Sequence, residues 1–439
     1  MDHVEATLEI YHRLTEVSAA PPPALRLWNG ESHGPPDAES VLVLQHPGAM
    51  RALVLPPTDL AAGEAYIYDD IDIEGDIVHA LSFAAGLDGI SPLSPRAVGL
   101  AAIAVRLPNG LHRRHHERPV VRGRIHSPRR DRRVVSHHYD TGNEFFSTFL
   151  GDTMVYSCAY FLHPGEDLDL AQTRKLDVVA RKLQLSAGDR LLDVGCGWGS
   201  MVIHAARRYG VHATGITLSE SQAELARTRV AEAGVADQVE ILVRDYREMD
   251  GEFDAISSIG MVEHVGRRQL DEYFRALRRL LAPGGQVLNH GIVDRNQTSP
   301  RVRRRGFVGT YVFPDGDLLP LATTLEVAEE AGFETRDVEA LRAGYALTLR
   351  RWVAALEANR DRAVLVAGER TYRIWRLYMA GSAVAFDSGA IGIYQTLLAD
   401  PARPWTHGRS MLLATDDRTT AAPASHRETR PRSLSPAGS

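Results

Sequence analysis

Residues 190–199, RLLDVGCGWG, are the stretch that decides the fold. A short apolar run ends in Asp193 and is followed by three glycines at alternate positions, Gly195, Gly197 and Gly199. Glycine lets the backbone turn tightly and approach a ligand where a side chain would clash. The spacing G-x-G-x-G differs from the dinucleotide fingerprint G-x-G-x-x-G, and no cation stands in the turn to meet a pyrophosphate. We predict the first strand-to-helix turn of a ligand-binding sheet, with a plain helix-packing turn as the alternative.

Short apolar runs alternate with longer helix-like segments around this turn. Strands are expected at residues 190–194, 211–215, 239–243, 254–258 and 286–290. Helices are expected at residues 171–185, 200–209, 220–233 and 268–281. Short buried strands separated by such helices are typical of a parallel sheet that is covered on both faces. We therefore predict an α/β, Rossmann-like fold with a doubly wound, mostly parallel sheet.

The N-terminal part follows a different pattern and predicts a small α+β domain over residues 1–105. Residues 41–55, VLVLQHPGAMRALVL, are expected to form two short strands around a Pro-Gly turn, and residues 77–85 a helix. This part shows no nucleophile–base or metal-ligand spacing, and lipid binding is one role open to it. The other expected units are a basic linker at 106–135, the α/β domain at 136–400 and a disordered, polar tail at 401–439.

Bulk properties limit the class of protein. The length of 439 residues favours two domains over one core. No apolar run approaches the roughly 18 residues of a membrane span. The N-terminal sequence MDHVEATLEIYHRL lacks the basic start and apolar core of a signal peptide. A disulfide framework cannot be inferred from the two cysteines, Cys158 and Cys196. We expect a reducing, cytoplasmic setting.

A basic segment interrupts the otherwise acidic chain, whose net charge is −6. Between Arg113 and Arg133 there are nine arginines against Glu117 and Asp131. Such a segment can attach a protein peripherally to an anionic membrane, and a solvated linker is an equally open alternative. No nucleic-acid partner is expected, and a homodimer stays open. The histidines in and near this segment lack a metal-ligand spacing, so no metal is expected: His112, His115, His116, His137 and His138.

The glycine-rich turn resembles the first motif of the Rossmann-like methyltransferases, which implies S-adenosylmethionine as cofactor. In that interpretation Asp193 and the three glycines accommodate its amino-acid part. The second strand ends without the acid that usually binds ribose, so neutral hydrogen bonds are expected from Thr217 and Gln222. After the third strand, Asp245 is placed to accept from the adenine amino group and Tyr246 to lie against the ring. A helix cap or turn is the alternative role for Asp245.

Five further segments occur in a fixed order: HYDTGNEFF at 138–146, MVYSCAYF at 154–161, GMVEHVG at 260–266, YVFPDG at 311–316 and YALTLRRW at 345–352. Together they resemble the cyclopropane fatty acid synthases and their mycolic acid relatives, over about residues 135–397. Residues 63–76 resemble the family's N-terminal part more loosely. The resemblance implies methyl transfer from S-adenosylmethionine to the double bond of an unsaturated fatty acyl chain, carried by a phospholipid, and closure of a cyclopropane ring.

The resemblance also implies a set of site residues. A bound bicarbonate ion would remove the proton that closes the ring, held by Cys158, Glu263, His290 and Tyr345 with the backbone around Ile292. Tyr156 and Ser157 would contact the cofactor. Taken singly, each has a structural alternative: Cys158 as a buried apolar residue, Glu263 in an ion pair, and His290 and Tyr345 as core residues. His264 is expected to point away from the site.

Departures from the family pattern leave the product open. The fifth strand reads Asn289-His290-Gly291-Ile292 instead of a His-Thr-Ile-Gly variant, and residues 339–342 replace the usual His-Asn-Phe-Gly. An arginine-rich insertion lies at 301–305. The alternatives are a methyl- or methylene-branched acyl chain of the tuberculostearic type, C-methylation of a small soluble natural product, and an inactive lipid-binding protein.

Overall fold

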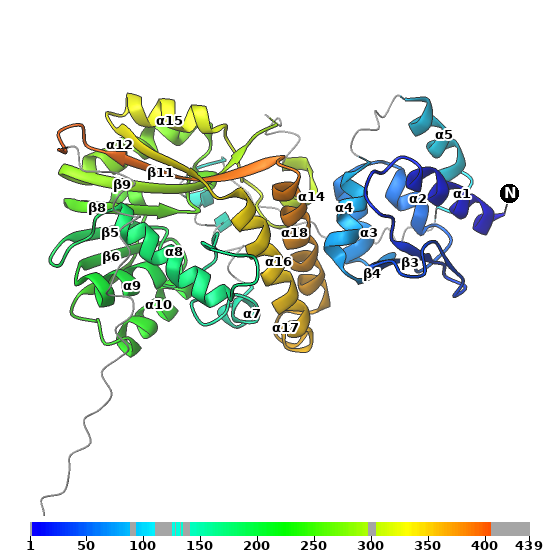
Figure 1. Ribbon diagram of the computed structural model, residues 1–439, viewed down its shortest axis with the longest axis horizontal. Coiled ribbons are helices and arrows are strands. Elements are labelled where there is room, and N and C mark those ends of the chain that lie inside the picture. Colours follow the sequence, from blue (N-terminus) through cyan, green and yellow to red (C-terminus); the bar gives the residue numbers. More distant parts are fainter. Residues whose placement is uncertain are drawn as a thin grey trace, which may run out of the picture.

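The computed structural model describes residues 2–87, 94–109, 125–127, 129–131, 133–134, 141–296 and 304–404. Its larger part is a seven-stranded sheet in the order β10-β11-β9-β8-β5-β6-β7 (Figure 1). The strands are β5 (Arg190–Val194), β6 (His212–Thr217), β7 (Val239–Val243), β8 (Phe253–Ile259), β9 (Leu281–Asp294), β10 (Glu334–Ala340) and β11 (Ile391–Ala399). Strands β5 to β9 pair in parallel, whereas β10 and β11 run antiparallel at one edge. The predicted Rossmann-like, mostly parallel sheet is confirmed.

Helices cover both faces of this sheet (Figure 1). They are α8 (Leu168–Lys182), α9 (Ser200–Tyr209) and α10 (Glu220–Glu232) on one face, and α12 (Leu270–Leu280) and α15 (Leu321–Glu330) on the other. Neighbouring residues of one strand serve opposite faces: Leu191 belongs to the core beneath α8–α10, and Leu192 to the core beneath α12 and α15. This double burial explains why the strands are continuous apolar runs.

The predicted fifth strand was too short. Strand β9 extends from Leu281 to Asp294, through the Pro-Gly-Gly turn that was expected to precede it. Its pairing with β8 shifts register between Phe253 and Ala255, which accommodates this turn as an irregularity in the strand. The later residues of β9 pair with β11 as far as Asp294, and such distant pairing leaves no local sequence signal.

The N-terminal part holds a four-stranded sheet in the order β2-β1-β3-β4. Its elements are α1 (His3–Thr15), β1 (Ala24–Arg26), β2 (Ser32–His33), β3 (Ser40–Leu44), α2 (Ala49–Val54), α3 (Asp59–Ile67), β4 (Ile71–Gly75), α4 (Ile77–Ala85) and α5 (Pro95–Ala104). The expected hairpin over 41–55 is wrong, because Gly48 caps helix α2 and β3 pairs with β1 and β4 instead. Ala, Met, Arg and Leu in residues 49–53 favour a helix intrinsically. The helix predicted over 77–85 is confirmed.

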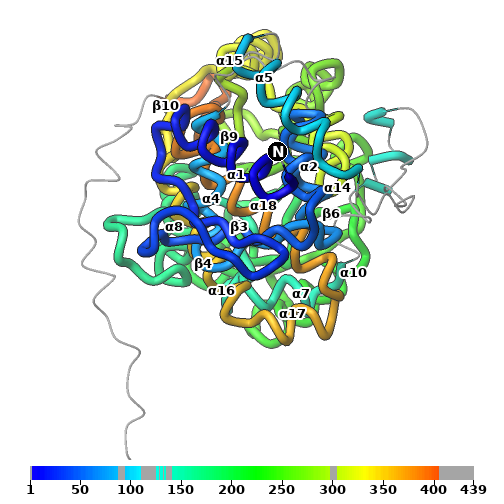
Figure 2. Tube along the Cα trace, turned by 90° about the vertical axis from the view of Figure 1, so that its right-hand side faces the viewer, coloured from blue at the N-terminus to red at the C-terminus, as the bar shows by residue number. Residues whose placement is uncertain are grey.

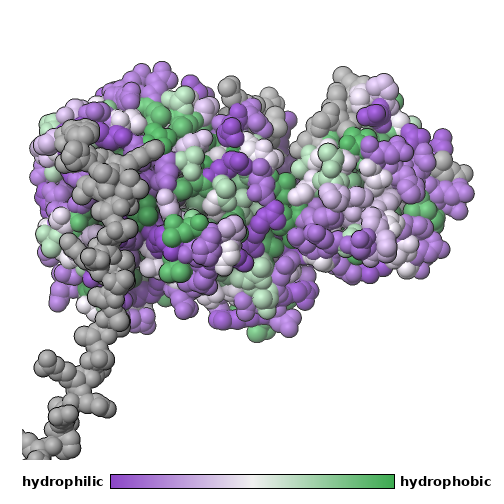
Figure 3. Space-filling view, viewed as in Figure 1, coloured by the Kyte–Doolittle hydropathy of each residue, from purple (hydrophilic) through white to green (hydrophobic). Residues whose placement is uncertain are grey.

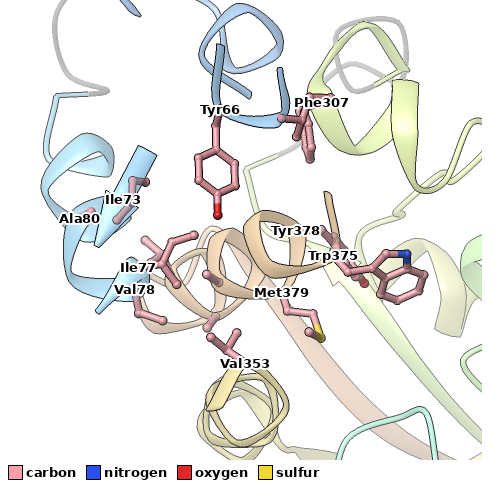
Figure 4. Close-up of a cluster of buried hydrophobic side chains, with 14 of the residues drawn as sticks. Tyr66, Ile73, Ile77, Val78, Ala80, Phe307, Val353, Trp375, Tyr378 and Met379 are labelled. Atoms are coloured by element: carbon pink, nitrogen blue, oxygen red, sulfur yellow. The ribbon is translucent and has the colours of Figure 1, made fainter. Parts of the chain in front are cut away.

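One hydrophobic core joins this N-terminal part to α16 (Arg342–Ala358) and α18 (Glu369–Asp387), which lie between it and the large sheet (Figure 1). Figure 4 shows Ile77 and Val78 facing α18, and Met379 of α18 facing Val353 of α16. Figure 2 shows the N-terminal part in front of α18. In Figure 3 hydrophobic residues gather beside this junction on an otherwise largely hydrophilic face. One side of α18 therefore packs into the hydrophobic core of the N-terminal part.

Two buried arginines of α18 strengthen this junction. Arg376 donates to the carbonyls of Ile73 (3.1 Å) and Gly75 (3.2 Å) and pairs with Glu357 (2.6 Å). Arg373 donates to the carbonyls of Tyr66 and Ile71 and pairs with Asp72 (2.9 Å). These charge-assisted bonds satisfy backbone groups that burial would otherwise leave without partners. The domain boundaries expected from the sequence stay predictions.

Candidate active site

A pocket opens at the carboxyl ends of β5, β6 and β7, the edge where ligands bind in open α/β sheets. Nine of the ten residues predicted to bind a cofactor line it: Tyr156, Ser157, Asp193, Gly195, Gly197, Thr217, Gln222, Asp245 and Tyr246. These residues come from four separate segments of the chain. The sheet topology therefore brings together the side chains that the motifs placed apart in sequence.

The glycine turn forms the floor of the pocket. Gly195 and Gly197 have φ angles of +79° and +54°, which favour glycine. A Cβ on Gly197 would meet no protein atom within 4 Å, so the space beside it belongs to the pocket. Gly199 does not line the pocket: it caps α9, and a Cβ there would lie 3.3 Å from Cβ of Ala226. The alternative interpretation, a plain helix-packing turn, is therefore correct for Gly199.

Asp193 is a buried acid in the pocket wall. It is 3% exposed and accepts a hydrogen bond from Oγ of Ser257 at 2.6 Å. Burial raises the pKa of Asp193 to about 6, opposed by that hydrogen bond and by the charge of Lys175. The carboxylate is thus ionised at neutral pH and can accept from a cationic ligand group.

Thr217 and Gln222 meet inside the pocket, as their predicted shared role requires. Oγ1 of Thr217 donates to Oε1 of Gln222 at 2.8 Å, and both residues are buried. This pair stands where many nucleotide-binding folds place an acid. The amide nitrogen of Gln222 remains oriented by a fixed neighbour and offers neutral donors to a ribose.

Asp245 has two roles in the structure. It lines the pocket, and it caps the short helix η1 (Tyr246–Glu248) by accepting from the backbone of Arg247. The guanidinium of Arg247 also binds both of its carboxylate oxygens, at 2.8 and 2.6 Å, and donates to Asp131 at 2.9 Å. The alternative of a turn residue is therefore correct without removing Asp245 from the pocket.

The end of the basic segment packs onto this site. Arg130 binds Asp315 through two hydrogen bonds of 2.6 and 2.8 Å, and Asp131 lines the pocket. Nδ1 of His126 lies 3.1 Å from the carbonyl of His264. Arg130 thus stabilises the fold instead of facing solvent or lipid. Residues 110–124, which hold five of the nine arginines, lie outside the described residues.

A second group of predicted residues lies on β9 and the turn after β8. Glu263, in α11 (Val262–Val265), is buried, and its Oε1 accepts from the backbone N–H of Ile292 at 2.7 Å. Nδ1 of His290 lies 3.4 Å from Nε2 of Gln395. Among the described residues, Oε2 of Glu263 and Nε2 of His290 have no hydrogen-bond partner although both are buried. Buried polar atoms of this kind call for a small polar ligand or water.

Burial sets the protonation states of this group. It raises the pKa of Glu263 to about 7, opposed by the hydrogen bond from Ile292. It lowers the pKa of His290 well below its usual range, with Lys175 and Lys182 adding to the effect. His290 is therefore neutral at physiological pH, while Glu263 is poised to change charge there.

Cys158 packs against the start of α16, the helix that carries Tyr345. Sγ of Cys158 donates to the carbonyls of Ala159 (3.3 Å) and Leu341 (3.8 Å), and a Cβ on Gly344 would lie 3.8 Å from it. Burial raises the pKa of the Cys158 thiol, so it stays protonated. Tyr345 is 7% exposed and packs against Phe386 at 4.8 Å between ring centroids.

An aromatic cluster, which the motifs did not predict as a unit, adjoins the pocket through Tyr156. The ring of Tyr156 lies 5.3 Å from Trp352, 5.8 Å from Trp375 and 5.6 Å from Phe146. Tyr345 in turn lies 6.1 Å from Trp352. The cluster carries apolar surface and aromatic faces from the cofactor pocket towards α16 and α18.

The family model for mycolic acid cyclopropane synthetase matches residues 126–396. The chain belongs to this family. A probable fatty acid methyltransferase of Pseudomonas putida is 39% identical over 88% of this chain and 95% of its own length. A probable fatty acid methyltransferase of Mycobacterium tuberculosis is 35% identical over 86% and 93%.

Solved structures of cyclopropane synthases share the fold. The cyclopropane synthase MmaA2 of Mycobacterium tuberculosis has a TM-score of 0.59 and 32% identity, covering 61% of this chain and 98% of its own. A mycolic acid cyclopropane synthase complexed with SAH and CTAB has a TM-score of 0.58 and 35% identity, covering 61% and 98%. The chain described here is therefore an S-adenosylmethionine-dependent methyltransferase with a Rossmann-like catalytic fold.

The residues present fit that cofactor. The open space beside Gly197 admits a ligand backbone, and the ionised Asp193 suits an amino group. Thr217, Gln222 and Asp245 supply the polar groups that the ribose and adenine need. The unpartnered atoms of Glu263 and His290 fit a small ion able to donate and accept hydrogen bonds, such as bicarbonate.

The segment 339–342, which departs from the family pattern, makes its own side-chain contacts in the structure. Glu339, which stands in the altered segment 339–342, accepts from the hydroxyl of Tyr160 at 2.8 Å and from Nζ of Lys182 at 2.6 Å. His264 contributes to the pocket lining and its ring lies 5.5 Å from Phe313, so the expectation that it points away from the site stays a prediction. Burial lowers the pKa of His264 to about 4, so it is neutral.

Lys175 is the main site residue that the motifs missed. It is 1% exposed, lines the pocket and donates to Oγ of Ser157 at 3.0 Å. Its signal was the placement of Gln172 and Lys175 on the apolar side of α8.

Within the described ranges, no group of His, Cys, Asp or Glu could hold a metal ion. Across the same ranges, no helix is both long and apolar enough to cross a bilayer.

Proposed function

We propose that this protein transfers a methyl group from S-adenosylmethionine to a carbon of the double bond in an unsaturated fatty acyl chain, carried by a phospholipid. One observation carries the proposal: among the described residues, Glu263 and His290 (the polar pair) keep unpartnered buried atoms on segments that adjoin the pocket-lining Met261 and Ile259. The aromatic cluster reaches the pocket at Tyr156. When bound, the cofactor supplies an electrophilic methyl group. An alkene is a weak nucleophile, so the chain's residues must align it and exclude water.

The aromatic cluster serves the charge that develops on the acyl chain. Faces of Tyr156, Trp352 and Trp375 can stabilise a cation that is desolvated beside them. Their burial also keeps water from adding to the cation. Charge stabilisation and exclusion of water are thus performed by the same rings.

The polar pair serves the proton that must leave. Glu263 is fixed by the backbone of Ile292, and His290 by Gln395, so the two unpartnered atoms have defined positions. We assign them, with Cys158 and Tyr345, to the holding of a bicarbonate ion, which would supply the base for this proton. Loss of a proton from the added methyl closes a cyclopropane ring, and loss from a chain carbon leaves a branched product.

A branched product is the second candidate. A relative named tuberculostearic acid methyltransferase, of Mycobacterium tuberculosis, is 36% identical over 62% of this chain. The two relatives that cover most of this chain carry the name fatty acid methyltransferase, not cyclopropane synthase. Gly291, which follows His290 in the sequence, also stands where the family usually has a threonine.

Incubation with radiolabelled S-adenosylmethionine tests the proposal. Vesicles of a mono-unsaturated phospholipid should acquire label in the released acyl chains, whereas vesicles of the saturated counterpart should not. Label that is acquired with both kinds of vesicle and stays with the head group when the acyl chains are released would contradict the proposal. Label in neither, with methylation of a water-soluble acceptor, would favour the natural-product alternative.

A further inference from the structure

Lys175 is a buried cation with no close counter-ion in the part of the chain that the structure describes. Moving an ammonium group out of water is costly unless it is paired or hydrogen-bonded. Among the described residues, no carboxylate lies within ion-pairing distance of its Nζ, and its one hydrogen bond goes to the neutral hydroxyl of Ser157. An ammonium has three donors, so two remain unused there. Burial of the Lys175 ammonium therefore costs free energy that its contacts with the described residues do not offset.

Lys182 provides the contrast on the same helix. It is also buried, at 5% exposure, but it pairs with Glu339 at 2.6 Å and Asp337 at 3.3 Å. It does not line the pocket. These two ion pairs explain Lys182 as a structural residue, whereas Lys175 lines the pocket.

The charges around Lys175 leave it positive at neutral pH. Burial lowers its pKa to about 8, and the more distant charges of Asp193 and Cys158 oppose this effect. Asp193 on β5 directs its carboxylate to Ser257 instead. His290 on β9, which feels the charge of Lys175, is neutral. The ammonium of Lys175 and the carboxylate of Asp193 hence both line the pocket wall without pairing directly, whereas Asp131 and Asp245 are both bound by Arg247.

These two charges match the two ends of an amino acid. Lys175, Ser157, Asp193 and Gly195 line the same pocket, and the adenine-side residues Asp245 and Tyr246 lie beyond the next strands. The methionyl part of the cofactor carries a carboxylate and an ammonium on one carbon. We propose that Lys175 and Ser157 bind the α-carboxylate of S-adenosylmethionine, opposite Asp193, which meets its α-ammonium. The inference rests on cofactor binding by the proposed methyltransferase and is independent of the acceptor.

Calorimetric titration tests this subsite without turnover. The two ligands are S-adenosylhomocysteine and its decarboxylated analogue, which differ only in the carboxylate. Lys175→Met should weaken the homocysteine ligand about 10–100-fold, the range for a hydrogen-bonded charge, and leave the analogue within about twofold. Lys182→Met, the matched buried lysine, should lower thermal stability and leave the affinity ratio of the two ligands unchanged.

The outcomes are distinct. Equal losses for both ligands in Lys175→Met would mean that Lys175 only holds the loop of Ser157, and no loss would remove it from the site; either result overturns the inference. A failure of acyl methylation with an intact affinity ratio would overturn the acceptor proposal alone.

The wild-type protein gives a second test that needs no variant. The preference for the carboxylate-bearing ligand should be constant near pH 7 and fall as the pH rises past about 8, because Lys175 then loses its proton. The neighbouring Asp193, His290 and Cys158 do not titrate in this window, given their shifted pKa values. A preference that stays constant to pH 9 contradicts the assignment.

Discussion

Most of the cofactor-binding residues lie within one region of the chain, residues 193–246, although Tyr156 and Ser157 come from an earlier segment. The acceptor wall is gathered from more distant segments. We define the cofactor wall as Asp193–Gly197, Thr217, Gln222, Asp245 and Tyr246, and the acceptor wall as Glu263, His290, Tyr345, Trp352 and Trp375. The first depends on backbone turns at three neighbouring parallel strands. The second depends on the packing of β9 against β11 and of α16 against α18.

This difference separates two kinds of specificity. Cofactor recognition needs positive φ angles and a few hydrogen bonds, which neighbouring residues provide locally. The fate of the acceptor cation depends on buried atoms whose positions are set across the sheet, such as Glu263 by Ile292. A substitution in one wall should therefore leave the function of the other intact, and the variants below test that separation.

The largest effect is expected for Glu263→Gln. The amide keeps the shape and the hydrogen bond from Ile292 but removes the charge that polarises the proton acceptor. Turnover should fall by roughly 10²–10⁴, the usual contribution of general acid–base assistance. Affinity for S-adenosylmethionine should be unchanged by calorimetry. Added bicarbonate should stimulate the wild type more than the variant; wild-type turnover in the variant would remove Glu263 from the mechanism.

The pH dependence of stability offers a related check. A carboxyl whose folded pKa is raised binds its proton more tightly in the native state. Its contribution is therefore present below the unfolded value of 4.5 and is lost as pH rises to about 7. Glu263→Gln should gain stability relative to wild type over that interval. Denaturant titrations at pH 5 and pH 8 measure the difference, and an equal effect at both would contradict the raised pKa.

Gly197→Leu should break the cofactor wall. Its side chain would enter the pocket, and affinity for S-adenosylhomocysteine should fall at least about 100-fold, or ~2.7 kcal/mol. Gly234→Leu is the matched control: its φ is +69°, its Cβ would also meet nothing within 4 Å, and it does not line the pocket. Equal losses of affinity in the two variants would show strain and not occlusion.

Trp352 tests the aromatic part of the acceptor wall. Both Trp352→Phe and Trp352→Leu leave a smaller side chain in the core, and both should lower stability by a few kcal/mol. Only Leu removes the aromatic face, so its turnover should fall below that of the Phe variant by about 3–30-fold, the range of a desolvated cation–π contact. Similar turnover numbers in the two variants would limit Trp352 to packing.

The smallest effect is expected for Thr217→Val. Loss of the hydroxyl frees Oε1 of Gln222, and cofactor affinity should fall about fivefold, or ~1 kcal/mol. Gln222→Leu and the double variant complete a cycle in which the two losses should not add, since the residues share one hydrogen bond. Additive losses would show that each residue contacts the cofactor separately.

The same contrast explains how much the sequence predicted. Strand β5 and the pocket residues were predictable because glycine spacing and apolar alternation are local properties. The length of β9 was not, because its last residues are strand only through pairing with β11. The helix at 49–54 was missed because a Pro-Gly pair can begin a helix as well as a hairpin.

Site residues defined by burial also escaped prediction. Lys175 has no motif, and its importance depends on a buried position beside Ser157. Arg130 looked like part of a solvated or membrane-facing segment until its pairing with Asp315 was visible. Contact of the remaining basic segment with an anionic membrane stays a prediction, measurable as salt-sensitive binding to anionic vesicles.

Methyl-deuterated S-adenosylmethionine tests the central claim most directly. The protein is incubated with vesicles of a mono-unsaturated phospholipid, and the released acyl chains are analysed by mass spectrometry. Our account predicts acyl chains that carry the labelled carbon, have lost one of its three deuterium atoms and take up no hydrogen on mild catalytic hydrogenation, as a cyclopropane requires. Chains with two deuterium atoms that do take up hydrogen would carry a methylene branch instead. Label that retains all three would indicate a branched product, and an absence of label from the acyl chains would contradict methyl transfer to the double bond.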